Sequence, residues 1–219
     1  EYGALGADAY SLGTSTVSGN IELSTGTNIS AISGSNLILS GIVSGTGTLT
    51  KMDTGSLTLA GINTYTGSTS VSEGTLVLDN SAAMANGTEV DIASGATLRL
   101  DANETIGSLS GAGTLSMNSV NLTVNQTSDS SFSGTITGSG SDLAKSGSSK
   151  LTLSGTSTYT GSTSIRDGSL NVTGALNGTT GAIIGSGGTL EGTGSIFASS
   201  STNTLSIQSG GTLSPGVSG

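Results

Sequence analysis

Apolar and polar residues alternate along short stretches of the chain, and glycine-containing turns separate these stretches. In GATLRL at 95–100, the alternation puts Leu98 and Leu100 on one side and Thr97 and Arg99 on the other. This is the period of a strand with one buried side. The pattern of strand, glycine turn and strand recurs at 71–78, 90–100, 165–172, 182–192 and 205–216. No window has a helical period, and only SAAMANGTE at 81–89 is expected to form a single helical turn. The pattern predicts an all-β chain.

The chain also repeats itself on a larger scale. LTLAGINTYTGSTSVSEGTLVL at 57–78 returns as LTLSGTSTYTGSTSIRDGSLNV at 151–172, a shift of 94 residues, and the similarity extends the units to about 49–78 and 143–172. A shorter step of 22 residues leads from TLVL at 75–78 to TLRL at 97–100, so the long shift is expected to equal about four short ones. Steps of roughly 20–25 residues with two or three strands each predict a β-solenoid.

At this step the chain would make about nine coils and a rod of about 45 Å, because neighbouring strands lie about 4.8 Å apart. Residues 1–219 are expected to form one continuous segment, since no linker or change in composition interrupts them. The chain holds 37 Gly, 1 Pro and only 3% aromatic residues. Such a composition suits tight turns around a narrow column of aliphatic side chains.

The repeated unit resembles the passenger-associated repeat of bacterial type V autotransporters. LTKMDTGSLTLAGINTYTGSTSVSEGTLVL at 49–78 carries its lysine, its LTL strand, its NTYTG phrase and its G-T-L strand. The second copy departs from that pattern at Lys150 and Ser157. The resemblance implies a right-handed parallel β-helix, exported through the outer membrane to the bacterial cell surface. A start at Glu1 and an end at GGTLSPGVSG lead us to expect an excerpt of a longer passenger.

The TYTGSTS phrase occurs in both units and supplies the candidate site residues Tyr65, Gly67, Tyr159 and Gly161. In a functional interpretation, exposed tyrosines on one side of the rod contact a sugar or a partner protein. In a structural interpretation, each ring covers a turn and its hydroxyl bonds nearby backbone. The equivalent position of both tyrosines in the unit favours the structural interpretation.

Composition restricts the possible chemistry. Without His or Cys, the chain has no Ser-His-Asp or Cys-His system and no ordinary zinc site. We expect neither a cofactor nor a metal. The acids Glu89, Asp91, Asp101 and Glu104 form the densest cluster. A polysaccharide-acting enzyme would need Asp91 and Asp101 to meet, near Arg99; the alternative is solvated surface charge.

Two further signals are weaker. TGSGSDLAK at 137–145 partly matches a calcium-binding nonapeptide, but a single copy favours a plain turn. The net charge is −9 and the five Lys and Arg residues are scattered, so neither nucleic-acid binding nor membrane insertion is expected.

These observations lead to three hypotheses. The first is a non-enzymatic extracellular passenger segment, a stalk or adhesin scaffold that aids secretion and folding and contacts a host-cell or matrix protein or glycan. The second is a unit of an extracellular fibre or coat, formed by end-to-end self-association. The third is an enzyme acting on polysaccharide.

Overall fold

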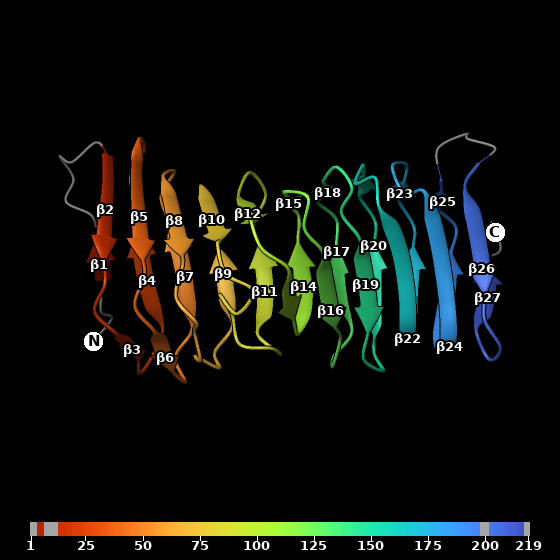
Figure 1. Ribbon diagram of the computed structural model, residues 1–219, viewed down its shortest axis with the longest axis horizontal. Helices are drawn as coiled ribbons and strands as arrows, with labels where there is room; N and C mark the ends of the chain where they lie inside the picture. Colours follow the sequence, from red (N-terminus) through yellow and green to blue (C-terminus); the bar gives the residue numbers. More distant parts are fainter. Residues whose placement is uncertain (1–3, 7–12, 198–201, 217–219) are drawn as a thin grey trace.

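The computed structural model describes residues 4–6, 13–197 and 202–216 of the chain. These residues form strands and turns, with no helix among them and therefore none that could cross a membrane. Parallel strands stack as a β-solenoid of about 10 turns, from β1 at one end to β27 at the other (Figure 1). This confirms the all-β parallel solenoid predicted from the alternation and the repeats.

Each coil passes through three faces in the same order, here named faces A, B and C. Face A holds β1 (Ala4–Gly6), β4 (Thr27–Ser30), β7 (Leu49–Met52), β9 (Thr69–Val71), β11 (Glu89–Ile92), β14 (Ser108–Gly111), β17 (Ser130–Phe132), β20 (Lys150–Leu153) and β27 (Thr212–Pro215). Face B holds β2 (Gly13–Val17), β5 (Ser35–Leu39), β8 (Ser56–Leu59), β10 (Thr75–Leu78), β12 (Thr97–Leu100), β15 (Thr114–Met117), β18 (Thr135–Thr137), β21 (Thr156–Ser157), β23 (Ala175–Leu176) and β25 (Ser195–Ile196).

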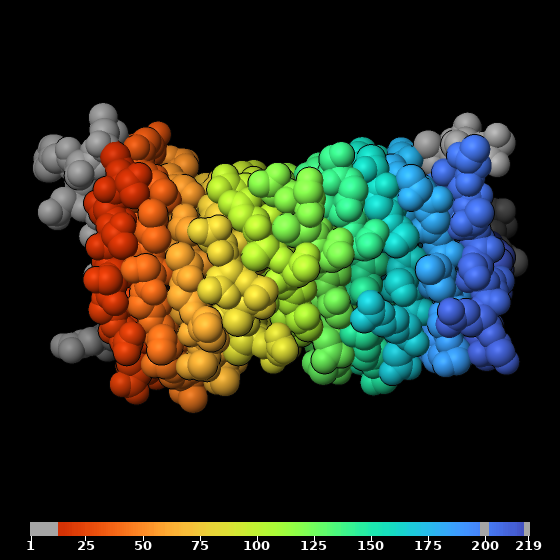
Figure 2. All heavy atoms as spheres, in the orientation of Figure 1, coloured from red at the N-terminus to blue at the C-terminus, as the bar shows by residue number. Residues whose placement is uncertain are grey.

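Face C holds β3 (Ile21–Leu23), β6 (Val43–Gly45), β13 (Glu104–Ile106), β16 (Leu122–Asn125), β19 (Leu143–Ser146) and β26 (Thr204–Ile207). The long strands β22 (Ser162–Val172) and β24 (Gly181–Gly192) begin on face C and continue onto face A. The coils together form one elongated body that narrows over its yellow and green part (Figure 2).

The core is a column of aliphatic side chains that repeat from coil to coil. On face B two ladders run along the rod: Leu37, Leu57, Leu76, Leu98, Leu115 and Ile136, and beside them Leu39, Leu59, Leu78, Leu100 and Met117. All of them are buried, and burying one such side chain contributes about 1.5–3 kcal/mol. The predicted 22-residue step is confirmed, because Thr75 pairs with Thr97 and Leu78 with Leu100.

The two repeat units do not lie on equivalent faces. Lys51 is on β7 of face A, whereas Lys145 is on β19 of face C. From Lys51 the register runs through Val71, Ile92 and Gly111 to Phe132, which is four coils of 19 to 21 residues. Lys145 follows two faces later. The expectation of about four steps is therefore wrong, because most coils are shorter than 22 residues.

The helical turn expected at 81–89 is also absent. This segment makes two tight turns, with hydrogen bonds from the Ala83 amide to the Asn80 carbonyl and from the Thr88 amide to the Ala85 carbonyl, each 3.0 Å. Between these turns Ala83 and Met84 are buried in the core. Continuing the ladder through Met84 decides the backbone here, since a local helix would remove this side chain from the column.

Glycine at the corners lets the coils approach closely. A Cβ placed on Gly67 would lie 2.1 Å from the carbonyl oxygen of Gly47, and one on Gly161 would lie 2.2 Å from that of Ser141. Real Cβ atoms do not approach backbone so closely, so both glycines of the TYTGSTS phrase are required by the spacing between coils.

We expect Gly67→Ala to lower the free energy of unfolding by about 1–3 kcal/mol, because the added methyl group forces neighbouring backbone apart. Gly19→Ala is the matched control, since a Cβ at Gly19 meets no atom within 4 Å. Urea unfolding followed by circular dichroism measures both variants. Equal midpoints for the two variants would contradict the role given to the corner glycine.

Candidate functional site

The tyrosines of the repeated phrase lie inside the coil. Tyr65 and Tyr159 are both 0% exposed, and their hydroxyls bond the Oγ1 atoms of Thr69 at 2.8 Å and Thr163 at 2.5 Å. The bonding partner is thus a threonine side chain four residues on, where sequence analysis expected backbone. Burial raises the pKa of both hydroxyls above the ordinary tyrosine value. A ring that stacks on a ligand has to be exposed, and neither of these rings is.

The lysines of the repeat are buried and hold three carbonyl groups each. Lys51 Nζ donates to the carbonyls of Met52 at 2.7 Å, Asp53 at 2.5 Å and Glu73 at 3.2 Å. An ammonium has three N–H donors, so each donor finds one acceptor. Glu73 lies in the turn one coil further on, and Lys51 therefore ties two successive turns together. We name this arrangement the lysine clamp.

The second repeat builds the same clamp on another face. Lys145 Nζ donates to the carbonyls of Ser146 and Gly147, both at 2.8 Å, and of Asp167 at 3.0 Å. Burial lowers the pKa of Lys51 to about 8, and the carboxylates of Asp53 and Glu73 oppose that effect. Burial also lowers the pKa of Lys145.

Sequence reasoning missed the clamp, although a signal was present. It treated both lysines as scattered surface charge, while each is followed 22 residues later by an acidic residue at the same place in the unit, Glu73 or Asp167. That spacing is one coil of the solenoid. A lysine and an acid one coil apart indicate turns stacked on each other.

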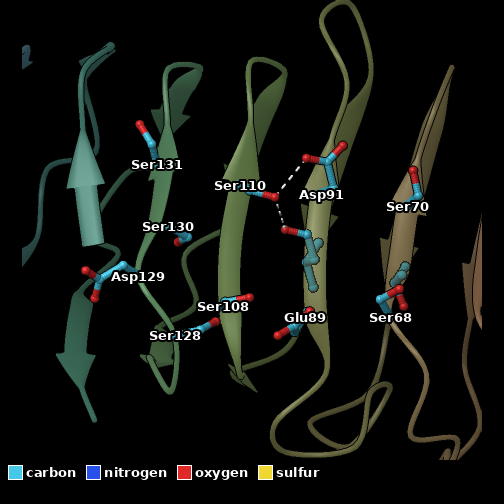
Figure 3. Close-up of a pocket in the computed structure, with 12 residues that line it drawn as sticks. Ser68, Ser70, Glu89, Asp91, Ser108, Ser110, Ser128, Asp129, Ser130 and Ser131 are labelled. Atoms are coloured by element: carbon cyan, nitrogen blue, oxygen red, sulfur yellow. Dashed lines mark hydrogen bonds between the residues drawn. The ribbon is translucent and has the colours of Figure 1, made fainter. Parts of the chain in front are cut away.

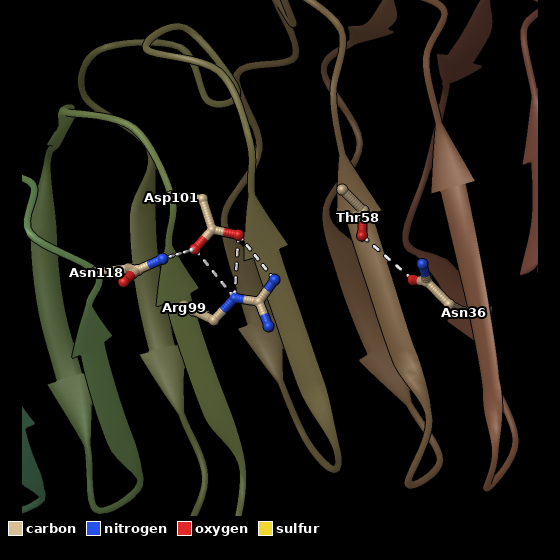
Figure 4. A network of polar contacts seen from close by, with 5 residues as sticks. All are labelled: Asn36, Thr58, Arg99, Asp101 and Asn118. Carbon is tan, nitrogen blue, oxygen red and sulfur yellow. Dashed lines mark hydrogen bonds and ion pairs between the residues drawn. The ribbon is translucent and has the colours of Figure 1, made fainter.

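The acid cluster of the sequence does not converge in space. Glu89 and Asp91 point outward from face A, Asp101 follows β12 on face B, and Glu104 begins β13 on face C. Asp91 accepts a hydrogen bond from the Ser110 hydroxyl at 2.8 Å. Asp101 instead forms an ion pair with Arg99 at 2.7 Å (Figure 4). The expected meeting of Asp91 and Asp101 is wrong, because the chain turns a corner between them.

Face A carries a shallow groove of about 420 Å³ over β9, β11, β14 and β17 (Figure 3). It is lined by Ser68, Thr69, Ser70, Glu89, Val90, Asp91, Ser108, Ser110, Ser128, Asp129, Ser130 and Ser131. Hydroxyls and three carboxylates dominate this lining, and no cation is part of it. The groove is therefore suited to hydrogen bonding with a polar, uncharged or cationic ligand.

The groove does not form a metal centre, and neither does the turn at 137–145. Nowhere in the described residues do three or more potential acidic ligands gather around one point. In the turn, the Asp142 carboxylate accepts hydrogen bonds from the Ser162 amide at 2.7 Å and the Ser162 hydroxyl at 3.1 Å. Asp142 thus links two coils, in agreement with the plain turn favoured by the single copy.

Glu104 is the one acid of the cluster that the fold buries. It is 3% exposed, and its carboxylate accepts hydrogen bonds from the Met84 amide at 3.3 Å and the Thr105 amide at 3.0 Å. Burial raises its pKa to about 7, and the backbone hydrogen bonds oppose that effect. Glu104 therefore links β13 to the preceding coil at a cost that depends on its charge.

Replacing Lys51 by Met keeps the aliphatic stem and leaves three carbonyls without their donor. We expect the free energy of unfolding to fall by about 3 kcal/mol, since an unsatisfied buried acceptor costs about 1–3 kcal/mol. Lys150→Met is the matched control. Lys150 is 44% exposed and pairs with Glu191 at 3.0 Å, so its loss should cost less than about 1 kcal/mol. Urea unfolding compares the two, and similar losses would refute the clamp.

The raised pKa of Glu104 predicts a pH dependence. Between pH 4.5 and about 7 the unfolded chain releases the Glu104 proton while the folded chain retains it. The free energy of unfolding should therefore decrease as the pH rises through this window. Glu104→Gln removes this contribution, so the difference between wild type and variant should change across the window. Unfolding midpoints from pH 4 to 8 measure it, and parallel profiles would exclude a raised pKa.

Comparison with known proteins agrees with this architecture. Residues 49–78 and 143–172 match the passenger-associated-transport-repeat family. Over 146 residues, 62% of this chain, the protein is 40% identical to the adhesin BmaC autotransporter of Brucella suis biovar 1 (strain 1330). The match spans 4% of that relative's length, and no solved structure matches the chain.

The matches fall on the features that the structure explains. Both family matches coincide with the predicted repeat units, and each contains one lysine clamp and one buried tyrosine. The relative is itself an autotransporter, so the resemblance inferred from the repeat is confirmed. With two transport repeats in one parallel solenoid, the chain is a segment of a type V autotransporter passenger, exported to the cell surface.

Proposed function

We propose that this segment is a non-enzymatic adhesin scaffold: a rigid extracellular rod that presents its polar outer faces to a host-cell or matrix component. The observation that carries the proposal is the 40% identity to an autotransporter that is named as an adhesin. Because the match spans 4% of that protein, adhesion is transferred to this chain as a proposal only.

The geometry supports this role in two ways. The conserved features of the unit, the clamp and the tyrosine, lie inside, so outward residues are free to vary without disturbing the stacking. The groove on face A also provides a hydroxyl-rich surface without a nucleophile next to a histidine or cysteine base. Such a surface is suited to binding rather than to covalent catalysis.

The clamps further support a role in secretion and folding. A chain that emerges unfolded has to nucleate its first coils, and neighbouring-coil contacts then propagate the fold. Each lysine fixes two successive turns through hydrogen bonds to three carbonyls. We propose that the two transport repeats are sites where coil stacking starts.

A fibre or surface coat is the second candidate. It is favoured by the exposed apolar residues Leu205, Ile207 and Leu213 on β26 and β27, which are 40%, 48% and 41% exposed. A second copy that stacks on these strands would cover them. This candidate requires the purified chain to associate end to end.

The test is attachment of beads coated with the full chain to cultured epithelial cells and to matrix proteins. We expect saturable attachment that the soluble folded chain inhibits and the heat-unfolded chain does not. Electron microscopy of the same preparation examines self-association. Filaments without attachment to cells or matrix would overturn the adhesin proposal in favour of the coat.

A further inference from the structure

Face C carries a second groove with a different character from that of face A. Two adjoining hollows of about 340 and 260 Å³ share the residues Asn121, Thr123 and Arg166. The first extends toward β13, and the second extends toward β22 and β24. Together they form one trough along the rod, which we name the C-face trough.

The register explains why this trough exists. The outward positions of successive coils are Thr105, Thr123, Ala144, Ser164 and Ile183, paired in that order from β13 to β24. Small side chains in the middle of this column leave the sheet surface low. Successive positions are about 4.8 Å apart, so hydroxyl groups recur along the trough at roughly the length of one sugar residue.

Arg166 is the only cation of the chain that has no internal partner among the described residues. Lys51 and Lys145 are buried in their clamps, Arg99 pairs with Asp101, and Lys150 pairs with Glu191. Arg166 is exposed and lines both hollows, and no hydrogen bond or ion pair joins it to any described residue. A free guanidinium offers a planar fork of donors that matches a carboxylate.

The surroundings limit what such a cation can bind. The chain has a net charge of −9, and Glu104 and Asp142 line the two hollows. A nucleic acid or another polyanion would therefore be repelled on either side of Arg166. A ligand with one carboxylate and many hydroxyls avoids that repulsion. Its hydroxyls can bond the serine, threonine and asparagine side chains of the trough.

We propose that the C-face trough binds a saccharide that carries a single carboxylate, with Arg166 holding the carboxylate. Asn121, Thr123 and Ser164 bond sugar hydroxyls, and Ile183, which is 38% exposed, contacts the apolar face of a ring. The inference rests on the proposed adhesin function and specifies its ligand. Sialic acids and uronic acids share the required chemistry.

The test is calorimetric titration of the full chain with two matched pairs of saccharides: sialyllactose against lactose, and cellobiouronic acid against cellobiose. We expect the acidic member of at least one pair to bind at least tenfold more tightly than its neutral counterpart, and the stronger pair identifies the source. A charge-assisted bond to a carboxylate is worth about 1.5–3 kcal/mol, which corresponds to at least a tenfold change in Kd.

Variants locate the binding to the trough. Arg166→Gln should weaken binding of the acidic saccharide at least tenfold, and Arg166→Lys should have a smaller effect because it keeps the charge and loses the fork. Arg99→Gln is the matched control, because it removes the same charge from face B and should leave binding unchanged. Circular dichroism verifies that all three variants keep the wild-type fold.

Three results would overturn the inference: no binding of either acidic saccharide at millimolar concentration, equal binding by Arg166→Gln, or equally tight binding of tri-glutamate. Cell attachment of the same variants separates the inference from the function on which it rests. Attachment that persists in Arg166→Gln would leave adhesion standing while the proposed ligand is rejected. Saccharide binding without cell attachment would instead reject adhesion and retain the trough.

Discussion

Hydrogen bonding between each coil and the next is the constraint on which the rest of this protein depends. A strand such as β8, Ser56–Leu59, has four residues and no partner within its own coil, so it exists only between β5 and β10. Stacking fixes the distance between coils at about 4.8 Å. Corners must then be narrow enough for backbone to pass over backbone, which is the reason that Gly67 cannot carry a Cβ.

The same stacking leaves polar groups inside the turns, and the lysine clamp supplies partners for three of them at once. A buried ammonium is costly by itself, but its three donors meet three carbonyls from two successive turns. The clamp recurs on faces A and C with nearly the same distances. It is therefore a local device that depends on two neighbouring coils and not on the face that carries it.

Because stacking uses the inward residues and the backbone, it leaves the outward residues free to differ between faces. Face A presents serines and carboxylates in one groove, whereas face C presents hydroxyls around the unpaired Arg166. Four of the five cations serve the structure or pair on the surface. Recognition by such a rod depends on which outward side chains the register aligns, and the repeated phrase itself is internal.

The sequence by itself determined the class of the fold, the 22-residue pairing of 75–78 with 97–100 and the repeat units, because period-two alternation and self-similarity are local properties of the chain. It could not place Lys51, Tyr65 or Asp91 relative to other coils. The tertiary structure alone decided that the lysines and tyrosines are buried, that Asp91 and Asp101 face different directions, and that Arg166 remains unpaired. The physical reason is that each corner redirects the chain by one face, and a few residues more or less per coil change which side chains meet.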